Sequence, residues 1–204
     1  MRAKIVDTTM ITKGTDMNDF APAAEPKSGK KVVFTSKGFP KEVMIVFGAK
    51  QYTVFEKNLP YIWTVNVDGT ELTQFVQGAY PVWSPDGSRI AFSSDVSGNW
   101  DIWVINADGS GLTQLSDDQK NQFAPSYSPD GKWLVFSSNI SGNYDIWLMK
   151  SDGTGATQLT VNGSHDTRPV ITPDGKYVYF NSNRGARKPG EPALQLWRIE
   201  LPRD

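Results

Sequence analysis

Hydrophobic and polar residues alternate in short runs along most of the chain, and turn-forming residues separate the runs. The runs at 89–94 and 133–138 are typical, since each ends in Phe-Ser-Ser and follows a Pro-Asp-Gly turn. Alternation over about four to eight residues predicts a half-buried β-strand. Pro-Asp-Gly and Asp-Gly suit tight turns, because Pro presets one backbone angle and Gly accepts a positive φ. The pattern therefore predicts an all-β fold built from short strands.

A repeat of 44 residues organises these strands. Trp83–Gly87 recurs as Tyr127–Gly131 and Ile171–Gly175, and the prolines at 85, 129 and 173 are each 44 residues apart. Every copy continues with a run ending in Phe, a polar loop and a second run that contains Trp. A degenerate fourth copy upstream begins at Phe20–Pro22 and includes Trp63. Four strands in a unit of about 44 residues are typical of a β-propeller blade.

The repeat resembles the TolB-type WD-like β-propeller family. The resemblance rests on Pro-Val-Trp-Ser-Pro-Asp-Gly from Pro81, the Ile-Ala-Phe-Ser-Ser run that follows it, and Asp-Ile-Trp-Val from Asp101. It covers roughly residues 4–201. A full TolB propeller has six blades and a separate amino-terminal domain, whereas this sequence shows four repeats. The resemblance implies a propeller fold and allows a periplasmic TolB-like role.

We therefore predict one all-β domain over residues 1–204, a small β-propeller of four four-stranded blades. The blades are expected at about 20–75, 79–118, 123–162 and 167–201. The last copy stops after its third strand, and residues 4–12 match the missing outer strand. We expect this amino-terminal strand to complete the last blade and close the ring, which would remove an exposed sheet edge. A two-chain ring of eight blades fits the same pattern.

Composition and charge exclude several classes of protein. The 204 residues include 21 basic and 22 acidic side chains, so a strongly basic nucleic-acid binder is excluded. Cysteine is absent, which excludes disulfides, thiolate zinc sites and a cysteine nucleophile. No apolar run approaches the ~20 residues of a transmembrane helix. No signal peptide is visible, so we expect a cytoplasmic protein, peripheral to a membrane at most, or a periplasmic one if a leader was removed.

Two insertions depart from the repeat, and both fall between the second and third strands of their blades. The segment between Ser36 and Tyr61 is about fifteen residues longer than its counterparts and contains two β-prone runs. Its apolar content is high for a loop facing only water, so we expect a protein-docking arm; an arm folded back over the ring is the alternative. The basic loop at 184–192 should stand beside it, or be a solvated loop. The predicted partner-binding residues are Val43, Met44, Ile45, Phe47, Tyr52, Phe55, Arg184, Arg187 and Lys188.

The mouth of the central channel is the other candidate site. Asp118, His165, Asp166 and Arg168 are its candidate residues, and Trp100 and Tyr144 could stack on a ligand. The sequence has one histidine, so a histidine zinc cluster is excluded. It also has no Gly-x-Ser-x-Gly elbow and no Gly-rich phosphate loop. We therefore predict no catalytic residue, no metal and no cofactor.

The sequence as a whole favours a non-enzymatic scaffold or protein-interaction subunit. It would dock through its long loops onto a larger complex, which could be membrane-bound. The alternatives are a small-molecule or carbohydrate-binding or lytic propeller that uses the channel mouth, and a TolB-like periplasmic component. The predicted partners are proteins, with no nucleic acid and no transmembrane segment, and a homodimer is compatible with the pattern.

Overall fold

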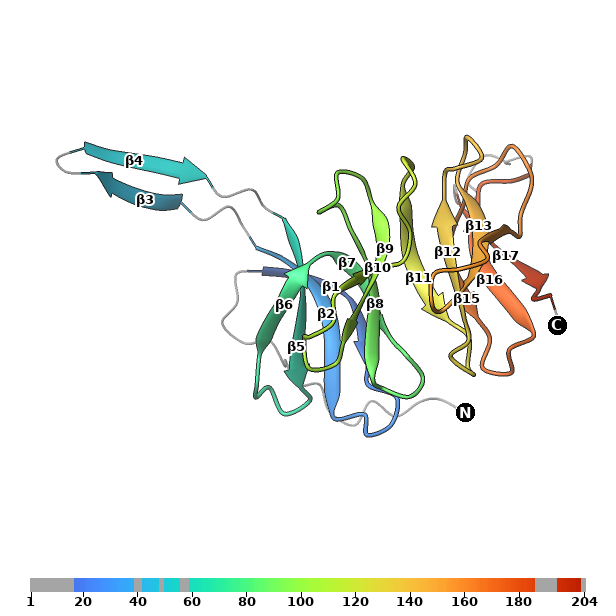
Figure 1. Cartoon of the computed structure of the whole chain (residues 1–204), viewed down its shortest axis with the longest axis horizontal. Helices are drawn as coiled ribbons and strands as arrows, with labels where there is room; N and C mark the ends of the chain where they lie inside the picture. The colour runs from blue at the N-terminus through green and yellow to red at the C-terminus, as the bar shows by residue number, and fades with distance from the viewer. Residues whose placement is uncertain (1–16, 39–41, 48–49, 56–58, 186–193, 203–204) are drawn as a thin grey trace.

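The structure is a computed structural model that describes residues 17–38, 42–47, 50–55, 59–185 and 194–202 (Figure 1). All regular elements of this part are β-strands, and every paired strand is antiparallel. The all-β prediction is confirmed. No helix among these residues is long and apolar enough to cross a membrane.

Fifteen of the described strands form four sheets that follow one another along the chain, which we call blades 1 to 4, and the other two strands pair with each other. Blade 1 contains β1 (Met17–Ala24), β2 (Lys31–Gly38), β5 (Pro60–Asn66) and β6 (Thr73–Gln77). Blade 2 contains β7 (Ala79–Trp83), β8 (Arg89–Ser94), β9 (Asp101–Asn106) and β10 (Thr113–Gln114). Blade 3 contains β11 (Gln122–Tyr127), β12 (Trp133–Ser138), β13 (Asp145–Lys150) and β14 (Thr157–Gln158). Blade 4 contains β15 (Asp166–Ile171), β16 (Tyr177–Ser182) and β17 (Gln195–Glu200).

The blades pack side by side in sequence order, with their first strands in contact. β1 contacts β7, β7 contacts β11, and β11 contacts β15. Figure 1 shows the same arrangement, with blade 1 at one end of the row and blade 4 at the other. Antiparallel four-stranded units packed through their inner strands are the architecture of a β-propeller, which confirms the predicted fold class.

A hydrophobic cluster fills each boundary between neighbouring blades. Val33 and Ile62 of blade 1 pack against Trp83, Ile90 and Phe92 of blade 2. The same repeat positions recur at the next two boundaries, where blade 2 packs on blade 3 and blade 3 packs on blade 4. The 44-residue repeat therefore places equivalent apolar residues in three successive cores.

The inner strands of blades 2 to 4 each contain a β-bulge that ties the strand to the preceding blade. Tyr80, Ala124 and Arg168 have φ values of 56°, 55° and 55°, which are unusual for residues other than glycine. Their backbone N–H groups donate to Thr35 Oγ1, Ser93 Oγ and Ser137 Oγ, each at 3.0 Å. These hydrogen bonds and the register of the bulges recur at every boundary between described blades. They fix how one blade is oriented on the next.

The Pro-Asp-Gly turns are held by their own aspartates. Asp86 Oδ1 accepts from Ser84 Oγ at 2.5 Å and from the Ser88 N–H at 3.0 Å. Gly87 follows with a φ of 71°, where a residue with a Cβ would be strained. The hydrogen bond from the Ser84 hydroxyl is the largest of the contacts that lower the pKa of Asp86 to about 2. The predicted tight turn is therefore present with the expected chemistry.

The predicted closing strand, residues 4–12, lies outside the described residues. Within the described part, blade 4 has three strands in the order β15-β16-β17 and blades 1 and 4 lie at opposite ends of the row (Figure 1). Closure of the ring by residues 4–12 stays a prediction, and so does the proximity of the two long loops that depends on it.

Candidate functional site

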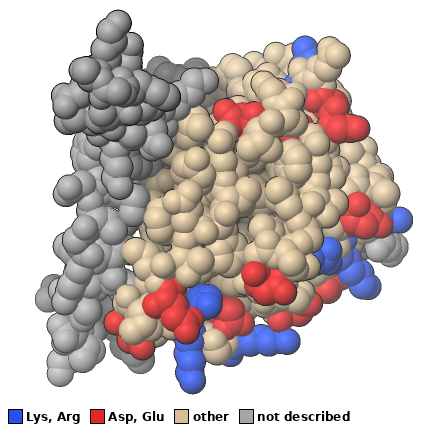
Figure 2. Space-filling view, turned by 60° about the vertical axis from the view of Figure 1, so that its left-hand side comes forward, with Lys and Arg blue, Asp and Glu red and all other residues tan. Residues whose placement is uncertain are grey.

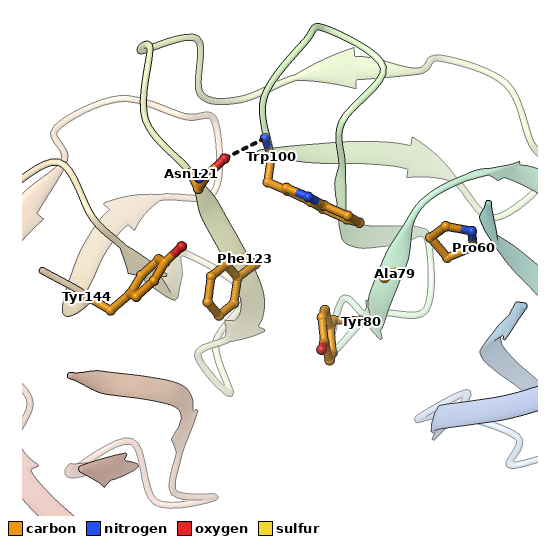
Figure 3. Close-up of a pocket in the computed structure, with 7 residues that line it drawn as sticks. All are labelled: Pro60, Ala79, Tyr80, Trp100, Asn121, Phe123 and Tyr144. Atoms are coloured by element: carbon orange, nitrogen blue, oxygen red, sulfur yellow. Dashed lines mark hydrogen bonds between the residues drawn. The ribbon is translucent and has the colours of Figure 1, made fainter. Parts of the chain in front are cut away.

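The described structure contains a pocket at the ends of the inner strands. It has a volume of about 510 Å³ and is formed by residues from blades 1, 2 and 3, together with the loops that precede β9 and β13. Figure 3 shows its lining residues, which are Pro60, Ala79, Tyr80, Trp100, Asn121, Phe123 and Tyr144. Four of the seven are aromatic, so the pocket offers flat apolar surfaces rather than charge.

The aromatic rings continue as a row from blade 2 to blade 4. The ring centroids of Tyr80 and Phe123 are 6.4 Å apart, and those of Phe123 and Tyr144 are 4.9 Å apart. His165 extends the row, with its ring centroid 5.9 Å from that of Tyr144. The guanidinium carbon of Arg168 lies 5.8 Å from the centre of the Tyr80 ring, within the range of a cation–π contact. The row therefore combines stacking surfaces with one cation and one imidazole at its edge.

Backbone hydrogen bonds hold the two loop aromatics in place. Trp100 and Tyr144 occupy the same repeat position, 44 residues apart. The Trp100 N–H donates to Asn121 Oδ1 at 3.2 Å, and its carbonyl accepts from the Gln122 N–H at 2.6 Å (Figure 3). Tyr144 makes the equivalent contacts with the next blade. The backbone of both aromatic residues is therefore hydrogen-bonded to the next blade, which fixes the position of their side chains.

Two of the four channel-mouth candidates lie beside the aromatic row. His165 is exposed and takes the position of Asn121 in the repeat; its Nδ1 lies 3.5 Å from the Tyr144 backbone nitrogen, which donates to it. Arg168 is also exposed and covers Tyr80 as described. His165 and Arg168 therefore lie at the edge of the aromatic row, next to the residues that line the pocket but not among them.

The two carboxylates among these candidates are occupied by other contacts. Asp166 is fully buried and forms an ion pair with Arg184. Asp118 accepts from the Lys120 N–H at 2.8 Å and from the Gln122 side-chain amide. Asp118 also lines a second hollow of about 170 Å³, which includes residues of blades 2 and 3. The four candidates do not converge on one reacting point.

The repeated aspartates at the start of β9 and β13 bind their own loops. Asp101 is 1% exposed and accepts from Ser97 Oγ at 2.6 Å and Gln114 Nε2 at 2.9 Å. Burial is the largest cause raising the pKa of Asp101. Asp145 makes matching contacts with Ser141 and Gln158. These bonds join the outer strand to the third strand in blades 2 and 3, so both aspartates have a structural use. Within the described ranges, no group of three or more His, Cys, Asp or Glu residues could hold a metal ion.

The predicted docking arm forms a sheet of its own. β3 (Glu42–Phe47) pairs with β4 (Lys50–Phe55) in antiparallel register, with Ile45 opposite Tyr52. Figure 1 shows this hairpin standing away from the four blades. The arm residues Val43, Met44, Ile45, Phe47, Tyr52 and Phe55 all lie on these two strands, of which only the backbone is described.

Of the three basic residues predicted to accompany the arm, Arg184 is described, and Arg187 and Lys188 lie outside the described residues. The Arg184 Nε donates to Ser182 Oγ at 2.9 Å, and its guanidinium pairs with Asp166. It also lies over the Phe180 and Trp197 rings, 5.2 and 5.0 Å from their centres. The Arg184 side chain is therefore already engaged within blade 4.

Charged side chains do not gather into a single strong patch on the face shown in Figure 2. Lys, Arg, Asp and Glu residues border a broad uncharged area on that face. The uncharged area consists of apolar and neutral polar residues.

Tyr80, Asn121 and Phe123 belong to the pocket but were not among the sequence candidates. Tyr80 and Phe123 occupy neighbouring rather than identical repeat positions, so a search for residues recurring every 44 positions does not pair them. The inner-strand proline is the sequence feature that marks both of them: Tyr80 lies one residue before Pro81, and Phe123 lies two residues before Pro125. Residues just before that proline lie at the bulge.

The four successive sheets and the Pro-Asp-Gly turns of blades 2 to 4 define a β-propeller built from a sequence repeat. Residues 48–189 match the model of the TolB beta propeller domain, known as PD40, and the chain belongs to this family. No curated protein sequence matched the chain.

Solved structures share the fold at low sequence identity. TolB from Acinetobacter baumannii is 23% identical with a TM-score of 0.66; the match covers 90% of this chain and 41% of that protein. A protein from Agrobacterium tumefaciens described as a TolB is 20% identical with a TM-score of 0.65, and the match covers 92% and 78% of the two chains. An oligogalacturonate lyase in complex with manganese is 17% identical with a TM-score of 0.63, covering 94% and 53%. This chain thus spans less than half the length of the Acinetobacter protein, and the likeness concerns the fold.

Proposed function

We propose that this protein is a non-enzymatic interaction subunit that docks onto a larger protein complex through the β3–β4 arm. The observation that carries the proposal is that the arm is a separate two-stranded sheet standing away from the blades (Figure 1). An isolated two-stranded hairpin is marginally stable in water. An arm with this sequence therefore gains stability when a partner covers it.

The sequence of the arm suits such a contact. It includes Met44, Ile45, Phe47, Tyr52 and Phe55 within 12 residues, and aromatic and Met side chains are enriched at interface cores. Burying one such side chain contributes about 1.5–3 kcal/mol. Together, five such side chains can contribute more than the lower end of the free-energy cost of association, which is about 4–15 kcal/mol.

The test is to replace Ile45 and Phe47 by Ser together and to recover tagged protein from native extracts. We expect the bound partner to be lost while the melting temperature changes by no more than about 2 °C, because surface substitutions cost within about 0.5 kcal/mol. Replacing Val96, which is 50% exposed in the β8–β9 loop, by Ser is the matched control and should retain the partner. A large fall in melting temperature in the double variant would show that the arm packs on the propeller itself, against the proposal.

The domain boundaries and the location belong to the same proposal. We take residues 1–204 as one propeller domain, because the family match at 48–189 runs through three blade boundaries. The proposed location is the cytoplasm, with a peripheral membrane position if the complex is membrane-bound. A TolB-like periplasmic component is the alternative, and fractionation of the native protein distinguishes the two.

The pocket and the aromatic row beside it support a second candidate function, the binding of a carbohydrate or another small molecule. The faces of Trp100, Phe123 and Tyr144 line a pocket large enough for a small ligand, and Arg168 and His165 could hydrogen-bond its polar groups. An oligogalacturonate lyase is among the proteins of similar fold. The carboxylates of Asp118 and Asp166 are engaged in other contacts and do not form an acid–base pair beside the aromatic row, which favours binding over lysis.

A further inference from the structure

Blade 4 has an exposed outer face at the end of the row. We call it the terminal face and define it by Val170, Tyr177, Tyr179, Leu196, Arg198 and Glu200. The strand register places these residues on one side of the sheet, since Tyr179 is opposite both Val170 and Arg198, and Tyr177 is opposite Glu200. Leu196 is opposite Asn181, two residues further along the same side.

In the other blades the corresponding face is buried against the next blade. The position of Leu196 is taken by Ile62, Ile102 and Ile146, and each of these is 0% exposed. Leu196 is 69% exposed. Val170, on the inner strand β15 of the same sheet, is 58% exposed. Blade 4 thus presents a packing face of the propeller that no described residue covers.

The chemistry of the terminal face differs from that of the internal faces. Where blade 3 has Val135 and Leu148, blade 4 has Tyr179 and Arg198. The Arg198 guanidinium lies over the Tyr177 ring, 4.6 Å from its centre. Tyr and Arg are enriched at the centres of protein interfaces. A face of this composition tolerates water when free and suits a contact with protein.

The first blade of a second copy is a poor match for this face. At the boundary between blades 1 and 2, blade 2 contributes Phe92 and Ile105 to the shared core. The equivalent residues of blade 1 are Phe34 and Val65, and they are already buried, at 3% and 2% exposed. A head-to-tail contact between copies would therefore find its receiving face covered.

A two-fold contact between terminal faces fits better. Arg198 and Glu200 project from the same side of β17, two residues apart and with opposite charges. In a two-fold contact both chains use the same surface patch, so every contact between two different residues occurs twice, once in each direction. A two-fold axis that passes between Arg198 and Glu200 therefore brings Arg198 of one chain to Glu200 of the other, twice, with one Leu196 side chain at either end of the contact. We propose that the chain forms a two-fold dimer through its terminal faces, independently of the arm.

Sedimentation velocity on the purified chain tests the dimer, at concentrations from about 1 to about 100 µM, where a moderate-affinity complex forms. We expect a species of twice the 22.6 kDa chain mass. Leu196→Asp should weaken dimerisation at least tenfold with an unchanged melting temperature, because the side chain is exposed in the single chain. Val67→Asp, at a 46% exposed position in blade 1 at the other end of the row, is the matched control and should leave the dimer intact.

A charge exchange identifies the partner as a second copy. Arg198→Glu should weaken the dimer, and Arg198→Glu combined with Glu200→Arg should restore it, since the exchanged pair is complementary only to itself. A wild-type chain that stays monomeric overturns the proposal, as it would if residues 4–12 closed the ring over this face. A large loss of thermal stability in Leu196→Asp, or assemblies that keep growing with concentration, would contradict it as well.

Discussion

Single aspartates set the geometry of the turns between the first two strands of blades 2 to 4. Asp86, Asp130 and Asp174 each accept a hydroxyl hydrogen bond from the residue two positions earlier, and each has a lowered pKa. Their carboxylates lie at the surface, so the lowering comes from hydrogen bonds to the charged form rather than from burial. The turn therefore depends on the ionised carboxylate.

This contact predicts a specific acid titration. The pKa of Asp86 lies at about 2 in the folded protein, against about 3.9 in an unfolded chain. Because the folded pKa is the lower one, the stabilisation is complete above about pH 4 and is lost as the pH falls towards 2. NMR titration of the Asp86 carboxyl carbon should give a midpoint near 2, and Ser84→Ala should raise it. A midpoint near 4 in the wild type would refute the account.

The bulges of the inner strands are the elements that join blade to blade. A positive φ costs free energy in a residue other than glycine. Here the backbone N–H of each bulged residue donates to a hydroxyl on the preceding blade. Ser93, Ser137 and Thr35 supply that hydroxyl at one repeat position. Blade 4 has Asn181 there.

Ser93→Ala tests the importance of one such bond. Ser93 is 0% exposed and Ala124 is 8% exposed, so the change leaves a buried N–H without its acceptor. We expect a loss of about 1–3 kcal/mol in the free energy of unfolding, measured by urea denaturation. Ser93→Thr keeps the hydroxyl and should cost less, and Ser110→Ala in an exposed turn should cost little. If Ser93→Ala and Ser110→Ala behaved alike, the bond between blades would be of no consequence.

The sequence predicts the elements better than the contacts between them. Pro85, Pro129 and Pro173 with their turns locate three blades, because turn chemistry is local and repeats. The bulges do not follow from side-chain type, since Tyr80, Ala124 and Arg168 share no side-chain property; their common sequence feature is the proline that follows each of them, and their conformation depends on the neighbouring blade. The aromatic pocket was found in part: Trp100 and Tyr144 recur at one position, whereas Phe123 joins them only through the packing of blades.

At the scale of the whole molecule, the described blades pack in a row, each on the blades next to it in sequence. Blades 2 and 3 each share a hydrophobic cluster with a blade on either side, whereas the described part of blade 4 shares one only with blade 3. The predicted closing strand would give blade 4 a second neighbour, but the sequence alone cannot tell that strand from a second chain, because both satisfy the same strand pattern.

This arrangement has a consequence for how the protein opens. In a linear array the terminal unit can unfold while the remainder stays native, and amide hydrogen exchange resolves such partial opening. We expect β8 and β12 to exchange slowest and β17 to exchange fastest among the long strands of blades 2 to 4, with mass spectrometry of peptides as the readout. Dimerisation through the terminal face would slow exchange in β17 as protein concentration rises and leave β8 unchanged. The exchange rate of β17 would then measure dimerisation directly, without a label or a second kind of protein.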